Sequence, residues 1–416
     1  MIFLVNVPDA TVCPAITKRI ANPFAASTHS IRLFFNVLIR FPVLEKLYGK
    51  VPAFSNRKTT LRVRQFLLPC YDSFVRIEQN ENIESFFARC RRNLNNTALN
   101  TFLDRKVTSG SEAYLRRQLK RAGAQEFDGP EDTWPSLFLS VDAFEKTPYH
   151  RNVTAALRGM HGDLYDTVIF DGNRLFNLDA VQPDRNRELN DWMKLRALDR
   201  DAETLVLADG DTEWMLDMPS EAATNDPFAR KAHGNVLLFG LGIGYVLYMT
   251  LCNPAVSHIT VVEYNPRVIE VFEQLLKPLF PDHDRFTILQ DDARNRWNEE
   301  WLSGFDCIFT DIWQSGEDGL FLMADLLSRA DVPLDKADFW IEDSCIVPLR
   351  TLVFLHYEEL LEHKPRPVAD DYQDLMNNVR RWFDSDPAVI DNSEALKDRL
   401  YSREVLRGIL GGRTCA

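Results

Sequence analysis

The chain has 416 residues, of which 45% are hydrophobic and 11% aromatic, and its net charge is −13. A chain of this length and composition can bury more than one hydrophobic core, so we expect two or three domains and exclude a disordered or fibrous protein. Its longest apolar runs are too short to cross a bilayer, which predicts no transmembrane helix and no membrane partner.

Seven cysteines form no Cys-x-x-Cys pair, and their odd number fits reduced thiols better than a disulfide framework or a zinc site. The apolar first residues have no basic segment before them, so we expect no secretory signal. We therefore predict a cytoplasmic protein without a bound metal. An organelle-targeting peptide in the basic stretch that ends near Arg40 is the weaker alternative.

Charge is distributed unevenly along the chain. Residues 1–122 hold 20 Lys and Arg against 8 Asp and Glu, whereas the remainder holds 28 against 53. The favoured interpretation is that the basic part docks on the acidic part of the same chain or forms a solvated helical surface. Binding of a nucleic acid such as RNA is the less favoured alternative, because no aromatic-interleaved recognition motif accompanies the charge.

The first half of the chain divides into two predicted regions. Residues 1–128 are expected to form a basic helical N-terminal domain, because apolar residues recur there at helical spacing between arginines. A Gly/Pro/Asp-rich break then opens a connecting region, residues 129–230. Two of its apolar runs, 167–170 and 204–208, each lead into an Asp-Gly pair and a second apolar stretch, which predicts two β-hairpins.

Residues 231–365 alternate short buried-strand runs with helical segments, which is typical of an α/β parallel sheet covered by helices. The predicted strands are residues 236–239, 259–262, 286–289, 307–310 and 339–341. The predicted helices are residues 245–251, 266–276, 320–328 and 349–361. A helical C-terminal extension, residues 366–416, follows with helices at 372–383 and 393–409.

A glycine-rich turn follows the first strand of this region. Gly240, Gly242 and Gly244 occupy the point where the chain leaves the strand and enters a helix. Open α/β sheets bind ligands at this edge, and glycines let a cofactor approach the main-chain amides. The alternative is a turn that needs glycine only for close packing of the strand and helix.

Acidic residues at the ends of the next three strands favour the ligand-binding interpretation. Glu263 lies 21 residues after Gly242, where a carboxylate can accept hydrogen bonds from both ribose hydroxyls. Asp292 is our choice over Asp291 for the residue that accepts from an adenine amino group. Asp311 ends the fourth strand at the same edge of the sheet, where we expect it to lie beside the group that a bound cofactor would transfer. Each acid taken alone could instead be a helix cap.

Other nucleotide-binding families do not match this pattern. The dinucleotide-binding motif would require glycine or alanine further along the turn, where this chain has Tyr245 and Leu247. No Gly-Lys-Ser/Thr sequence follows the glycines, which excludes a Walker-type phosphate loop.

These residues resemble the class I S-adenosylmethionine-dependent methyltransferases. Residues 205–319 are most similar to the spermidine synthase-like polyamine aminopropyltransferases, and the turn also resembles methyltransferase-like bacterial proteins of unassigned function. Leu238 supports the narrower resemblance, because many methyltransferases carry an acid there whereas aminopropyltransferases tend to have an apolar residue. The sequence that follows Asp311 differs from the Ser-Ser-Asp-Pro motif that the aminopropyltransferases usually have there, which argues against polyamine synthesis.

The resemblance implies a Rossmann-like methyltransferase sheet and an S-adenosylmethionine cofactor, or its decarboxylated form. It implies cofactor binding by Gly240, Gly242, Gly244, Glu263 and Asp292, and a catalytic role for Asp311. Our leading hypothesis is a methyltransferase acting on a small or peptide-borne nucleophile. Aminopropyl transfer and a non-catalytic regulatory role are the alternatives.

The sequence says less about the acceptor. A small-molecule acceptor that is cationic would be attracted by nearby acids, although such acids are more often solvated surface. Two tryptophans could line the pocket for the acceptor, or they could simply pack in the hydrophobic core. A homodimer is compatible with the sequence. The acids and tryptophans in question are Glu317, Asp318, Glu342, Asp343, Trp313 and Trp340.

Overall fold

The computed structural model describes residues 75–94, 98–210 and 212–415. Most of the predicted basic segment, residues 1–74, therefore lies outside the described residues. In the part of the chain that is described, no helix is long and apolar enough to span a bilayer.

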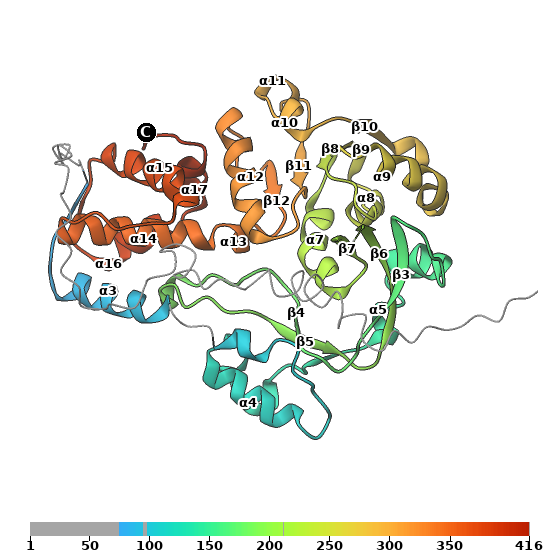
Figure 1. Cartoon of the computed structure of the whole chain (residues 1–416), viewed down its shortest axis with the longest axis horizontal. Helices are drawn as coiled ribbons and strands as arrows, with labels where there is room; N and C mark the ends of the chain where they lie inside the picture. The colour runs from blue at the N-terminus through green and yellow to red at the C-terminus, as the bar shows by residue number, and fades with distance from the viewer. Residues whose placement is uncertain (1–74, 95–97, 211, 416) are drawn as a thin grey trace, which may run out of the picture.

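A parallel five-stranded sheet organises the C-terminal half of the chain (Figure 1). Its order is β10-β9-β8-β11-β12, so the chain leaves the central strand β8 first toward one edge and later toward the other. This alternation of parallel strands and covering helices is α/β and Rossmann-like, which confirms the predicted fold class. The strands are β8 (Gly234–Phe239), β9 (Val256–Glu263), β10 (Phe286–Gln290), β11 (Cys307–Thr310) and β12 (Ala337–Phe339).

The first four strands agree with the sequence prediction, whereas the fifth is displaced. Residues 339–341 were expected to form a strand, but β12 ends at Phe339. Trp340 still donates a main-chain hydrogen bond of 2.9 Å to Thr310. Ile341 then adopts a left-handed conformation with φ 46° and starts the next helix. Phe339, Trp340 and Ile341 are all buried, so their apolar run reflects burial and not a continuous strand.

Helices cover the sheet and continue beyond it to the C-terminus. α8 follows the glycine turn, α9 follows β9, and α12 connects β11 with β12. The helices of this part are α7 (Pro219–Lys231), α8 (Tyr245–Leu251), α9 (Pro266–Val271), α10 (Ala293–Arg296), α11 (Glu299–Leu302), α12 (Gly316–Arg329), α13 (Glu342–Cys345), α14 (Val347–Glu362), α15 (Gln373–Asp384), α16 (Ser393–Tyr401) and α17 (Arg403–Leu410).

Two predicted helices are interrupted. The expected helix at 266–276 changes to a π-helical turn from Phe272 to Leu276. The expected helix at 393–409 breaks at Ser402, whose side chain accepts a hydrogen bond from the amide of Val405 and so caps α17. Apolar periodicity continues across both interruptions, which is why the sequence does not reveal them.

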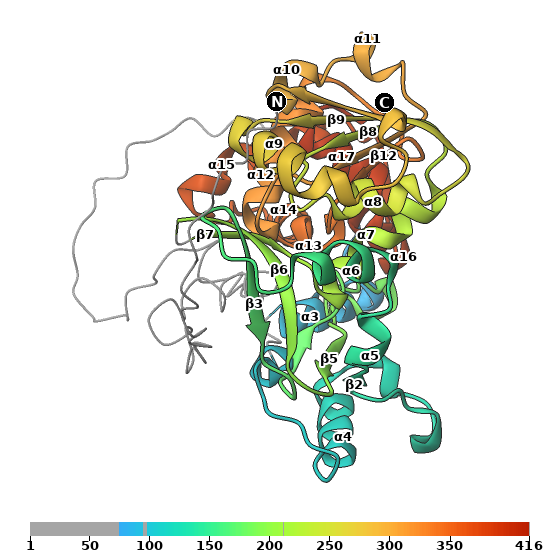
Figure 2. The same cartoon turned by 90° about the vertical axis from the view of Figure 1, so that its right-hand side faces the viewer.

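Two smaller sheets of short strands precede the parallel sheet. β3 (Tyr165–Phe170), β6 (Ala202–Asp209) and β7 (Thr212–Leu216) form one sheet, and β2 (Phe138–Leu139), β5 (Leu195–Leu198) and β4 (Phe176–Asn177) form another. In Figure 2, β3 and β6 lie below the parallel sheet, with α6 (Pro148–Asn152) beside β6 and α5 (Val141–Phe144) farther to the right, near β2 and β5.

One of the two predicted hairpins is correct. β6 and β7 pair across Asp209-Gly210, with a register irregularity at Leu207 and Ala208. The hairpin expected at Asp171-Gly172 is wrong, because β3 pairs with β6 instead. Gly172 packs against the main chain of Arg200, and the following amide bonds to the carbonyl of Leu198. These contacts direct the chain toward β5.

The described N-terminal helices pack in two different places. α3 (Glu81–Asn93) lies against α14 and α16, and β1 (Arg76–Ile77) pairs with β13 (Val389–Ile390) of the C-terminal extension. α4 (Glu112–Ala122) contributes instead to a separate cluster with β5. The two helices lie well apart in Figure 1.

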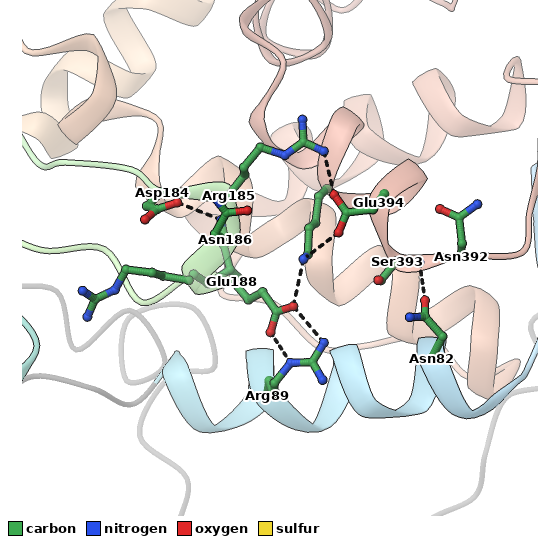
Figure 3. A network of polar contacts seen from close by, with 12 residues as sticks. Asn82, Arg89, Asp184, Arg185, Asn186, Glu188, Asn392, Ser393 and Glu394 are labelled. Carbon is green, nitrogen blue, oxygen red and sulfur yellow. Dashed lines mark hydrogen bonds and ion pairs between the residues drawn. The ribbon is translucent and has the colours of Figure 1, made fainter. Parts of the chain in front are cut away.

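Ion pairs accompany the docking of α3 (Figure 3). Glu188 accepts hydrogen bonds from Arg89 of α3 and lies 3.1 Å from the ammonium of Lys397 on α16. Burial opposes ionisation of Glu188, but these partners outweigh it and lower the pKa of its carboxyl. Arg91 pairs in the same way with Glu358 and Glu362 of α14. Basic side chains of α3 thus contact acids of the same chain.

Candidate functional site

A cavity of about 430 Å³ lies at the carboxyl ends of the central strands. It brings together five of the six predicted site residues, namely Gly240, Gly242, Glu263, Asp292 and Asp311. Gly244 does not line it. In the described part of the chain, no group of three or more His, Cys, Asp and Glu residues could hold a metal ion.

The glycine turn requires glycine at both positions that line the cavity. Gly240 has φ 95°, and a Cβ there would lie 2.0 Å from the carbonyl oxygen of Asp311. Gly242 has φ 53°, and its Cβ would lie 2.6 Å from the sulfur of Met215 on β7. Larger residues would therefore both strain the backbone and displace neighbours. Gly244 lies behind the turn, against the rings of Phe272 and Phe280.

Two tyrosines from the preceding region hold this turn in place. The hydroxyl of Tyr165 donates to the carbonyl of Gly242 at 2.8 Å, and that of Tyr149 donates to the carbonyl of Ile243 at 2.6 Å. Both tyrosines are buried, and burial raises the pKa of each hydroxyl, so they remain donors. The sequence gives no sign of these two contacts, because each joins residues far apart in the chain.

Glu263 connects the glycine turn to the end of β9. One carboxylate oxygen accepts from the amide of Leu241 at 2.9 Å and the other from the amide of Asn265 at 2.7 Å. Burial raises the pKa of this carboxyl, and the amide hydrogen bonds oppose that rise. Each oxygen retains a second lone pair, so the side chain can also accept from a ligand. Tyr264, which is 72% exposed, follows it at the edge of the cavity.

Asp291 and Asp292 line the cavity just after β10, where the amide of Asp291 donates to the carbonyl of Glu263 at 3.1 Å, and both carboxylates are held by neighbours. Asp292 accepts from the amide of Arg294, caps α10 and pairs with the Arg294 guanidinium at 2.6 Å. Asp291 accepts from Asn295 and from Arg296, the latter at 2.6 Å. These hydrogen bonds lower the pKa of both carboxyls, so both are ionised at neutral pH.

Asp311 lies at the end of β11, where its amide donates to the carbonyl of Phe239 at 2.9 Å. No residue in the described ranges donates a hydrogen bond to its carboxylate, and burial raises the carboxyl pKa to about 7. Glu221 of α7 also lines the cavity, and burial together with the charge of Asp311 raises the pKa of Glu221 well above its usual value. Glu221 was not among the predicted site residues, because α7 is polar and contains Pro227, so that no helix was predicted there.

Aromatic residues close the side of the cavity near these acids. Trp313 and Trp340 are both buried and line it, so they serve the core and the cavity together. The indole of Trp340 donates to Thr224 of α7 at 3.0 Å, which fixes α7 relative to β12. Trp214 of β7 lines the cavity and is partly exposed.

The other acids that the sequence analysis considered are not among the cavity-lining residues. Asp318 accepts from the amide of Gln314 at 2.9 Å, close to the start of α12. Glu342 pairs with the buried Arg407 at 2.6 Å, and Asp343 pairs with Arg403 at 2.8 Å. Glu317 is likewise absent from the lining.

No protein-family model matches the chain, and no curated protein sequence matches it. Three of the solved structures to which it is similar are human methyltransferase-like protein 13 in complex with SAH, spermidine synthase from Thermotoga maritima and shikimate dehydrogenase from Mycobacterium tuberculosis. The first is 25% identical with a TM-score of 0.17, over 21% of this chain and 41% of that one. The second is 19% identical with a TM-score of 0.23, and the match covers 40% of this chain and 58% of that one. The third is 14% identical with a TM-score of 0.19, and the match covers 35% of this chain and 59% of that one.

The chain thus spans about half the length of each of these proteins. They are two transferase-type proteins and one dehydrogenase, so the function proposed for this chain rests on its own cavity.

Proposed function

We propose that this chain is an S-adenosylmethionine-dependent transferase that methylates a small or peptide-borne nucleophile. The observation that carries this proposal is that the glycine turn, Glu263 and Asp311 border one cavity at the carboxyl edge of the sheet. This edge, where the chain reverses its direction of strand addition, is where open α/β sheets bind ligands. The cavity volume of about 430 Å³ lies within the range of small-molecule sites, about 300–1,000 Å³.

The residues at one end of the cavity fit the adenosine part of this cofactor. Gly240 and Gly242 leave the main chain of the turn open to a ligand, because neither has a Cβ. Glu263 presents a carboxylate beside the turn, suited to ribose hydroxyls. The exposed ring of Tyr264 offers an aromatic face on which adenine can stack. Asp292 remains our candidate acceptor for the adenine amino group.

The residues at the other end fit an acceptor nucleophile. When bound, the cofactor supplies a carbon that a sulfonium charge makes electrophilic. The protein contributes mainly by holding the nucleophile in line with that carbon, and such positioning accounts for much of the acceleration in transfer reactions. Asp311 would orient the nucleophile and accept its proton, for which a carboxyl pKa of about 7 is well matched at neutral pH. Trp313 and Trp340 would exclude water.

Aminopropyl transfer from decarboxylated S-adenosylmethionine is the second candidate. It is favoured by the pair of acids Glu221 and Asp311, because an aminopropyltransferase must bind a cationic amine. The two candidates differ in the cofactor they require, since decarboxylation removes the carboxylate of the methionine part.

Calorimetric titration of the full chain with four compounds tests the proposal. The compounds are S-adenosylmethionine, its decarboxylated form, S-adenosylhomocysteine and NAD. Methyl transfer predicts that the first and third bind and that NAD does not. Preference for the decarboxylated compound would favour aminopropyl transfer. Binding of NAD alone, or of none of the four, would contradict both transferase assignments.

A further inference from the structure

Glu221 is a buried acid that lines the cavity, and one of its two carboxylate oxygens has no hydrogen-bond partner among the described residues. It is 4% exposed, lies in the first turn of α7 and contributes to the cavity lining. Asn225 donates to its Oε2 atom at 3.0 Å. Its Oε1 atom accepts no hydrogen bond from any residue that the structure describes. Because Glu221 lines the cavity, this oxygen is available to accept a hydrogen bond from a ligand.

Asp311 faces the same part of the cavity from β11, and the negative charges of the two side chains repel each other. Arg294 is the one Arg or Lys among the residues that line the cavity, and it is paired with Asp292. The described residues that line the cavity thus offer the two acids no compensating cation. Two neighbouring carboxyls in a desolvated site cannot both be ionised unless a cation joins them.

The cation that this arrangement fits is an ammonium group. A primary or secondary ammonium carries at least two N–H donors, enough to reach one oxygen on each acid. Trp313 and Trp340 also line the cavity, and the face of an indole ring attracts a cation. A neutral alcohol would compensate neither carboxylate, and an anionic acceptor would be repelled.

We propose that the acceptor is a protonated primary or secondary amine, and that Glu221 and Asp311 bind its nitrogen from opposite sides. This inference rests on the proposed transferase function and narrows its substrate class. Glu221 acts by binding the acceptor, and Asp311 acts both by binding it and by receiving its proton.

The transfer step balances with these groups alone. An N–H proton of the ammonium passes to the Asp311 carboxylate, which frees the lone pair of the nitrogen. That lone pair forms a bond to the methyl carbon as the carbon–sulfur bond breaks, and the bonding electron pair remains on the sulfur. The product leaves as a methylated ammonium, and Asp311 returns its proton to water.

The test uses the full chain in two stages, so that failure of the cofactor site and failure of the amine site can be distinguished. In the first stage, calorimetry measures S-adenosylhomocysteine binding to the wild type, Glu221→Gln and Asp311→Asn. In the second, ligand-observed NMR titrates the loaded proteins with n-butylamine, 1,4-diaminobutane and Nα-acetyl-lysine methylamide, and with n-butanol as the neutral comparison. Glu299→Gln is the matched control, because it removes one exposed acid outside the cavity lining.

We expect at least one amine to bind the loaded wild type more tightly than n-butanol. Glu221→Gln should weaken that binding about tenfold or more while it changes the affinity for S-adenosylhomocysteine less than about twofold. Glu299→Gln should change neither. If Glu221→Gln fails to fold, Glu221→Asp, which retracts the carboxyl by one methylene, replaces it with the same expectation.

Two results would overturn the inference while leaving the cofactor site intact. One is a loaded wild type that binds no amine in preference to n-butanol, and the other is undiminished amine binding by the Glu221 variant. Absence of S-adenosylhomocysteine binding by the wild type would overturn both this inference and the proposed function.

Discussion

The hydroxyl of Tyr165 donates a hydrogen bond of 2.8 Å to the carbonyl oxygen of Gly242. This bond joins β3 of the antiparallel sheet to the glycine turn of the parallel sheet. The candidate cofactor site therefore depends on the region before the Rossmann-like part, which also contributes Trp214, Met215 and Glu221 to the cavity.

Replacing Tyr165 by Phe should weaken cofactor binding. The substitution leaves the Gly242 carbonyl without its partner, which we expect to cost about 1–3 kcal/mol of stability. Because the turn then loses its fixed orientation, affinity for S-adenosylhomocysteine should fall about tenfold. Calorimetry and thermal unfolding measure the two effects. Tyr114→Phe is the control, since Tyr114 is 61% exposed, and equal behaviour of the two variants would refute a positioning role for Tyr165.

Gly242→Ala should abolish measurable binding of S-adenosylhomocysteine. The new Cβ would require a left-handed alanine and would lie 2.6 Å from the sulfur of Met215. Gly159→Ala separates these causes, because Gly159 also has a positive φ, of 72°, but no atom lies within 4 Å of its Cβ position. The control should lose about 1–2 kcal/mol of stability and retain full binding. Normal binding by Gly242→Ala would show that the turn is not part of the cofactor site.

The protonation of Asp311 should control the pH dependence of transfer. Because burial raises its carboxyl pKa to about 7, the group is protonated and unable to accept a proton at lower pH. We therefore predict that kcat/KM decreases about tenfold per pH unit below pH ~7. Values of kcat/KM measured for the wild type at pH values below and above ~7 should show this decrease. The Asp311→Asn variant should be slow, and its kcat/KM should not fall in the same way at low pH. A wild-type profile that is flat below neutrality would contradict the role of Asp311 as proton acceptor.

The docking of α3 on the C-terminal extension should contribute substantially to stability. Phe354 of α14 is fully buried against Phe86 and Phe87, with ring centroids 6.4 and 5.3 Å away. Phe354→Ala should reduce the free energy of unfolding by about 3–5 kcal/mol, the usual cost of such a cavity. Denaturant unfolding measures the change. Leu275→Ala, at a residue that is 40% exposed, should cost much less, and comparable losses would contradict the central position of Phe354 in this core.

The sequence predicted most reliably what depends on neighbouring residues. Apolar runs located four strands of the parallel sheet, and the glycine turn and the acids that end the strands indicated which residues border the cavity. Signals of this kind arise from local backbone geometry and from the rule that parallel strands share one functional edge.

Contacts between distant segments were not predictable from the sequence in the same way. Nothing in the residues near Tyr149 or Tyr165 indicates that their hydroxyls reach the glycine turn. Glu221 was overlooked because the polar, proline-containing α7 lacks a clear helical pattern. The false hairpin at Gly172 has the same origin, since its turn follows a close contact with Arg200 rather than strand pairing.

A crystal structure of the full chain grown with S-adenosylhomocysteine tests the central claim most directly. We predict that the adenosine part occupies the cavity with its ribose hydroxyls on Glu263, and that the sulfur lies toward Asp311. A ligand bound elsewhere, or a cavity that stays empty at a saturating concentration, would contradict it.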